Sequence, residues 1–88
     1  MRYRSTIKIE RYTNPARIEP DGYSSIEILN ESATETLLID GMLSIPVGGS
    51  YAIENQPYVT MDSYITISPK GTEPFICVVV KTYFSEVE

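Results

Sequence analysis

The 88-residue sequence contains no histidine, no tryptophan and a single cysteine. Without histidine, the chain lacks the side chain that most often performs general acid–base catalysis near neutral pH and most often binds metals. Cys77 alone cannot form an internal disulfide or build a zinc site, and its apolar neighbours Ile76 and Val78 predict a buried thiol. These absences predict a chain that is not an enzyme, with no catalytic residues, no cofactor and no metal site.

Carboxylates are the remaining groups that could support chemistry. Asp40 with Asp62, or Glu54 with Asp62, has the residue types of a glycosidase pair. Asp21, Asp40 and Asp62 have those of calcium ligands, but they lack the D-x-D-x-D-G spacing of a calcium loop. We expect these acids to solvate turns and outer faces.

The sequence also lacks the patterns of a secretion signal and of a membrane helix. The basic residues of Met1–Arg4 are followed by alternating residues and not by an apolar run. No stretch approaches the ~20 apolar residues that a membrane helix needs. We therefore expect synthesis in a reducing cytoplasm, with no membrane partner.

Basic residues are absent from residues 18–69, which hold eight acidic ones, although the net charge of the chain is only −5. Residues 1–17 hold five basic residues against one acidic residue and predict a basic N-terminal strand or arm beside an acidic body. Either this segment offsets acidic neighbours in its own sheet, or it reaches an acidic surface of another subunit and adds to a sheet edge. We expect no nucleic-acid partner, because the acidic body would repel phosphate. The basic candidate interface residues are Arg2, Arg4, Lys8, Arg11 and Arg17.

Apolar and polar residues alternate with period two through most of the chain, which is typical of strands. In residues 3–12 one face carries Tyr3, Ser5, Ile7 and Ile9, and the other carries mostly charged residues, which predicts a strand half-buried on its isoleucine face. The further strands that we expect are residues 23–29, 36–40, 42–45, 50–54, 58–68 and 75–84.

Gly, Pro and Asn separate these runs. Asp40–Gly41 predicts a tight hairpin turn, and a change of phase near Asp62 predicts a bulge or a bend. Such closely spaced short strands predict an all-β chain. We expect one domain over residues 1–88, a single antiparallel β-sandwich of about seven strands, Ig-like or jelly-roll-like.

The seven tyrosines are a second feature that could form an interaction surface. Tyrosine rings can anchor a protein interface or stack on sugar, and they can also simply complete a thin core with the hydroxyl in water. The tyrosines that we select as candidate interface residues are Tyr23, Tyr51, Tyr58 and Tyr64.

The segment from Ser25 to Ser68 carries a family resemblance. It reads SIEILNESATETLLIDG over residues 25–41, IPVGGSYAIEN over 45–55 and YITIS over 64–68. This half of the chain resembles small β-sandwich accessory and structural proteins of tailed-bacteriophage virions, such as those of crAss-like phages. The resemblance implies a virion component that decorates the capsid, builds a head fibre or belongs to the tail, and it transfers no catalytic residues.

Taken together, these features predict a non-enzymatic structural or interaction protein of a virion. We expect its partners to be copies of itself, other virion proteins, or both, held through β-edges and tyrosine-rich surfaces. Two alternatives stay open. The acidic body could act as a decoy that binds a basic host nuclease or DNA-binding protein, and the tyrosines could belong to a carbohydrate-binding module.

Overall fold

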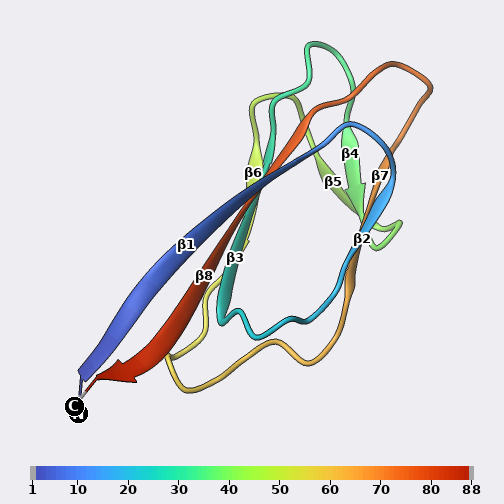
Figure 1. Cartoon of the computed structure of the whole chain (residues 1–88). Coiled ribbons are helices and arrows are strands. Elements are labelled where there is room, and N and C mark those ends of the chain that lie inside the picture. Colours follow the sequence, from blue (N-terminus) through green and yellow to red (C-terminus); the bar gives the residue numbers. More distant parts are fainter. Residues whose placement is uncertain (1, 88) are drawn as a thin grey trace.

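The computed structural model describes residues 2–87 as eight strands in two four-stranded antiparallel sheets (Figure 1). The first sheet has the order β1-β8-β3-β6, and the second has the order β2-β7-β4-β5. The predicted all-β antiparallel sandwich is confirmed. The strands are β1 (Arg2–Tyr12), β2 (Ala16–Ile18), β3 (Ser25–Asn30), β4 (Leu37–Ile39), β5 (Leu43–Ile45), β6 (Ser50–Ile53), β7 (Ile65–Pro69) and β8 (Cys77–Val87).

The strand pairing is nested from the ends of the chain to its middle. β1 pairs with β8, β2 with β7, β3 with β6, and β4 with β5. The chain is therefore one long hairpin, folded at the β4–β5 turn and rolled up so that successive strand pairs alternate between the two sheets. Of the two topologies expected, this order is that of a jelly roll and not that of an immunoglobulin domain.

The core lies between the sheets and uses the inward-facing residues of both. In β3, Ile26 and Ile28 are buried while Glu27 is exposed, as the alternation predicts. A three-residue strand can bury only one or two side chains, so the short strands β4 and β5 contribute little each. The buried hydrophobic residues are Ile18, Tyr23, Ile26, Ile28, Leu37, Ile39, Ile45, Ile65, Ile67, Phe75, Cys77 and Val79.

The prediction that the isoleucine face of β1 is buried is wrong. Ile7 and Ile9 are 62% and 68% exposed, and the face of β1 that turns inward carries Glu10 and Tyr12. The cause is the pairing with β8, whose inward residues include Val79: the register sets Glu10 opposite Val79, so the isoleucines point outward.

Two other differences concern the extent of strands. The run 58–68 forms a strand only from Ile65, and residues 58–64 form a loop that contains the predicted phase change near Asp62. Strand β2 was not predicted, because its three residues are too few to show an alternation. The predicted tight turn is confirmed: Asp40 and Gly41 both have positive φ, at 54° and 71°.

No helix among residues 2–87 is long and apolar enough to cross a membrane.

The two longest strands extend past the rest of the sandwich. β3 stops pairing with β8 at Ser25, opposite Thr82, so residues 83–87 pair only with residues 2–6 of β1. Figure 1 shows the resulting two-stranded ribbon projecting from the body with both chain ends at its tip. The ribbon elongates the molecule, which measures 49 × 21 × 17 Å along its principal axes.

Candidate interaction surface

Strand β1 forms an open edge of the first sheet. Within residues 2–87 its only neighbour is β8, so one side of an eleven-residue strand has no strand beside it. Proteins usually keep such edges short or cover them, because unpaired N–H and C=O groups are a template for another strand. The edge can therefore accept an added strand from a partner.

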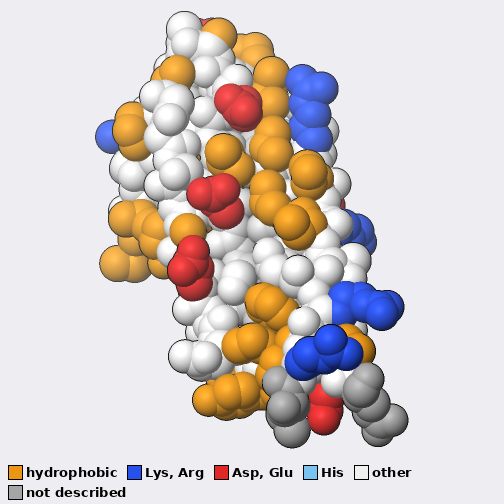
Figure 2. Space-filling model, turned by 90° about the vertical axis from the view of Figure 1, so that its left-hand side faces the viewer, with side chains coloured by type: hydrophobic (Ala, Val, Ile, Leu, Met, Phe, Trp, Pro, Cys, Tyr) orange, Lys and Arg blue, Asp and Glu red, His pale blue; other side chains and the backbone are white. Residues whose placement is uncertain are grey.

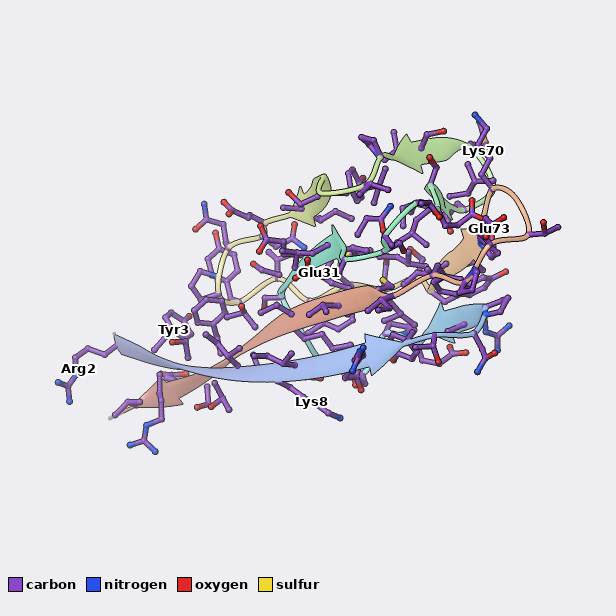
Figure 3. All side chains as sticks on the ribbon, turned by 90° about the horizontal axis from the view of Figure 1, so that it is seen from above. Arg2, Tyr3, Lys8, Glu31, Lys70 and Glu73 are labelled. Atoms are coloured by element: carbon purple, nitrogen blue, oxygen red, sulfur yellow. The ribbon has the colours of Figure 1, made fainter. Side chains whose placement is uncertain are left out.

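Four of the five predicted basic residues lie along this strand. Arg2, Arg4 and Arg11 are exposed, and none has an ion-pair partner among residues 2–87. The Lys8 ammonium lies 3.5 Å from the Glu10 carboxylate. Figure 3 shows Arg2 pointing away from the body at the ribbon tip and Lys8 projecting from β1 into solvent. The open edge is thus also a basic edge.

Arg17, the fifth basic residue, lies elsewhere. It is in β2, in the second sheet, where its side chain pairs with Glu19 and its guanidinium carbon lies 4.6 Å from the centre of the Tyr64 ring. A cation over a ring face occupies the surface that a sugar would stack on. The structure therefore separates Arg17 from the basic edge and gives it a local partner.

The four predicted tyrosines do not form one surface. Tyr23 is fully buried in the core, and Tyr51 is half-buried and packs against the core from β6. Tyr58 and Tyr64 are exposed, at 72% and 51%, in the loop between β6 and β7. The ring contact within the described chain joins Tyr23 to Tyr83, edge to face, with centroids 6.5 Å apart. Tyr23 therefore serves the core and cannot anchor a partner.

An ion cluster around Lys81 fixes β1 and the loop before β3 to the inner face of β8. Lys81 is 3% exposed, and its ammonium lies 2.9 Å from a Glu10 oxygen and 3.3 Å from an Asp21 oxygen. Tyr83 donates a hydrogen bond to Asp21 at 3.0 Å, and Tyr12 donates one to Glu10 at 3.0 Å. These contacts fix the register of the strand that carries the basic edge.

The cluster stabilises its charged forms. Burial alone would raise the pKa of Glu10 and of Asp21, but the hydrogen bonds from Lys81 and the two tyrosines lower the pKa of both carboxyls overall. For Lys81, burial would lower the pKa, and the bonds to Glu10 and Asp21 raise it overall. The cluster thus carries one positive and two negative charges at neutral pH.

Sequence reasoning missed this cluster, although one signal was available. Lys81 follows Cys77 and Val79 at intervals of two residues, so it shares their buried face. A lysine on a buried face needs acidic partners. The pattern could not identify Glu10 and Asp21 as those partners, because they lie in distant parts of the sequence.

The acidic residues considered for chemistry have structural partners or lie exposed. A carboxylate oxygen of Asp40 accepts hydrogen bonds from the Thr66 backbone N–H at 2.9 Å and from its hydroxyl at 3.2 Å. Glu54 and Asp62 are exposed. Within residues 2–87, no three His, Cys, Asp or Glu side chains are grouped as metal ligands would be. Cys77 is fully buried, and burial raises the pKa of its thiol to about 11.

Comparison with protein-family models, with curated proteins and with solved structures yields no match for this chain. The resemblance to phage virion proteins therefore stays a prediction. What the geometry defines is a jelly-roll domain in which the longest edge strand, β1, carries a row of basic residues.

Proposed function

We propose that the chain is a non-enzymatic structural protein, which binds a neighbouring subunit of a larger particle through the free edge of β1. The length of that edge carries the proposal: within residues 2–87, eleven residues have no strand on the side away from β8. An isolated two-stranded ribbon is marginally stable in water, and the projecting part of β1 and β8 has just this form. An added strand would extend the ribbon and hydrogen-bond its free backbone groups.

The charges on β1 define the kind of partner. Arg2 and Arg4 are exposed, lie on the same face of β1 and lack ion-pair partners among residues 2–87, so an extended acidic segment would complement them. The β1 strand of a second copy is disfavoured at this edge, because antiparallel pairing of two basic strands sets like charges opposite one another. The partner segment therefore comes from an acidic region of a neighbouring subunit.

The particle that we propose is a tailed-phage virion, in which the chain would decorate the capsid, form a head fibre or serve as a tail accessory protein. Two observations support this: the resemblance over residues 25–68, and the jelly-roll order of the strands. Viral capsid proteins use this fold, and so do lectins and cupins, so the support from the fold is by analogy.

Titration with a synthetic acidic strand tests the edge. The probe is a peptide of about ten residues in which glutamate and valine alternate, because period two puts all its charges on one face. Amide NMR shifts are expected to concentrate on residues 2–12, and the affinity should fall as salt rises. Equal binding of a lysine–valine peptide, or shifts confined to other strands, would show the proposal to be wrong.

A matched set of variants identifies the charges responsible. Arg4→Ser should weaken peptide binding by about three-fold or more, because Arg4 lies on the face of β1 that meets the acidic side chains. Arg17→Ser is the control, because it removes the same charge from the second sheet and should leave the affinity unchanged. Equal losses in both variants would mean that only net charge matters.

Co-purification with the products of neighbouring genes tests the role in a virion. Stable incorporation into a particle of virion proteins is the expected result. Salt-sensitive binding to a basic host nuclease without incorporation would instead favour the decoy function. Glycan binding that is lost on Tyr58→Ala would favour a carbohydrate-binding module.

A further inference from the structure

The outer face of the first sheet carries a column of apolar side chains that is interrupted at Thr82 of β8. Ile9 lies directly opposite Val80 in the β1–β8 pair, and Val78 lies opposite Leu29 in the β8–β3 pair. Figure 2 shows apolar side chains along the middle of this face, in two groups with other side chains between them. Single exposed apolar residues are ordinary, but a column with a polar rim marks an interaction site. The outward-facing apolar residues of these three strands are Ile7, Ile9, Leu29, Val78, Val80 and Phe84.

On this face of β1, the burial that the sequence pattern predicts differs from the exposure observed in the isolated chain. Alternation in β1 is that of a strand whose isoleucine face is covered, yet Ile7 and Ile9 are 62% and 68% exposed. The register with β8 cannot slip by one residue to bury them, because that would expel Glu10 from its contact with Lys81. Burial of the isoleucines therefore requires a second surface laid over the sheet from outside.

Charge on either side of the column indicates what that surface is. Figure 2 shows acidic side chains along one side of the apolar column and basic side chains along the other. On the outer face these include Glu27 on β3 and Arg11 on β1, with Glu31 just beyond β3. None of the three has an ion-pair partner among residues 2–87. When a second copy is laid face to face on the first, its acidic margin can lie over the basic margin of the first copy, and its basic margin over the acidic one. The face is therefore complementary to itself in charge.

The register makes this complementarity specific. Arg11 pairs with Val78, and Val78 pairs with Leu29, so Arg11 lies at the level of Leu29 along the strands. Glu27 and Glu31 lie two residues to either side of that level. Consider a two-fold axis that runs parallel to β8, just outside the sheet. Rotation about this axis leaves each residue at the same level along the strands. It also places β3 of one copy over β1 of the other. Each Arg11 then falls between the partner's two glutamates, Val78 and Val80 of β8 pack on their counterparts, and the partner's β3 covers Ile9 at the level of Glu27.

We propose that a second copy of this chain covers the outer face of the first sheet, forming a symmetric dimer about this axis. The two sheets would stack as in a sandwich, with strands within about 30° of each other. This inference goes beyond the proposed function and does not rest on it, since the dimer uses the face of the sheet. The edge of β1 stays open in the dimer, so both interactions can occur together.

Sedimentation velocity over a range of protein concentrations tests the dimer. The wild-type chain should approach twice its mass of 9.9 kDa. Ile9→Glu should raise the dimer dissociation constant by about 100-fold or more, because it puts two charges into an apolar interface. Ile9 is too exposed for this change to unfold the chain, as circular dichroism would verify. Met42→Glu is the control: it makes the same kind of change at an 88% exposed site in the β4–β5 turn and should leave the dimer intact.

A charge exchange tests the axis. Arg11→Glu and Glu27→Arg should each weaken the dimer by about ten-fold, and the double variant should restore most of the affinity. Arg11 and Glu27 sit two strands apart in one copy, so rescue reports a contact between copies.

Three results would overturn the proposal: a wild-type monomer at every concentration, a dimer indifferent to Ile9→Glu, or no rescue by the charge exchange. A monomer would assign the face to a partner other than a second copy. The variant of Arg2 and Arg4, both changed to serine, separates this proposal from the edge proposal: it should weaken peptide binding and leave the dimer unchanged. If it abolished the dimer instead, self-association would use the ribbon edge, and the face dimer would be wrong.

Discussion

At the scale of single residues, the buried Lys81 is the most consequential side chain of the inner face. Its ammonium is buried between Glu10 and Asp21, whose side chains keep 23% and 40% of their exposure. A buried charge costs free energy unless it is paired and hydrogen-bonded, and here the partners come from β1 and from the loop before β3. The cluster therefore ties three distant parts of the chain together through charge.

Stability should depend on pH through this cluster. Glu10 and Asp21 have lowered pKa values, so the free energy that they contribute is present above their ordinary values of 4.5 and 3.8. It is lost as the pH falls through their lowered pKa values. Lys81 has a raised pKa, and its contribution is present below 10.5 and lost as the pH rises through the raised value. Because the chain has no histidine, we expect a broad plateau near neutral pH, measurable by urea unfolding from acid to alkaline pH.

Lys81→Met should lower the free energy of unfolding at pH 7 by about 1–3 kcal/mol, since the acids keep some access to water. It should also make the loss of stability in acid shallower, because Glu10 and Asp21 would lose the part of the pKa lowering that Lys81 supplies. Lys70→Met is the control, as Lys70 is exposed and has no ion-pair partner among residues 2–87. Unchanged acid dependence in Lys81→Met would contradict this account.

At the scale of elements, the turn between β4 and β5 is where the rolled hairpin reverses. Asp40 and Gly41 both adopt positive φ, as the central residues of turns that match the twist of strands do, and Met42 completes the connection between paired Ile39 and Leu43. Asp40 also accepts two hydrogen bonds from Thr66 in β7, so the turn is fixed to the neighbouring strand. The turn residues in the sequence and the contact with β7 therefore favour the same conformation of this turn.

Gly41→Ala should lower the free energy of unfolding by about 1–2 kcal/mol, because a side chain disfavours φ near +71°. A Cβ atom at Gly41 would meet no atom within 4 Å, so the cost lies in the backbone and not in crowding. Ser44→Ala, at an exposed position of the adjacent β5, serves as the control and should change stability by less than about 0.5 kcal/mol. Urea denaturation measures both, and equal effects would contradict the role of the turn.

At the scale of the whole molecule, the jelly-roll order brings the two ends of the chain side by side. Arg2 pairs with Val87 at the ribbon tip, and every strand pair is nested inside this one. The two ends can therefore be joined without moving a strand. The loop between β6 and β7 is exposed at Asp62 and Ser63, which makes it a suitable place for new ends.

A circular permutant should keep the fold. Joining residues 87 and 2 through about four Gly or Ser residues, with new ends between Asp62 and Ser63, should preserve cooperative unfolding and lower Tm by less than about 10 °C. A permutant opened between Ile26 and Glu27 would interrupt the buried strand β3 and should not fold. Calorimetry distinguishes them, and failure of the first permutant would mean that the β1–β8 pair requires free ends.

Local pattern determined a good part of this protein. Period-two alternation predicted an all-β sandwich, with Ile26 and Ile28 in the core, and Asp40–Gly41 predicted the turn, because these features depend on neighbours in the chain. The charge asymmetry predicted a basic first strand. The same reasoning buried Ile7 and Ile9 and grouped Tyr23 with exposed tyrosines, and both predictions are wrong for the isolated chain.

The features that the sequence pattern did not predict were decided by the tertiary structure. Each of them depends on a residue far away in the sequence. The pairing of β1 with β8 chose which face of β1 turns inward, placed Glu10 beside Lys81 and turned the isoleucines outward. The order of the strands made β1 an edge, and so made its arginines available to a partner. Alternation can say that a strand has two faces, but only the register with a strand some 70 residues away says which of them is covered.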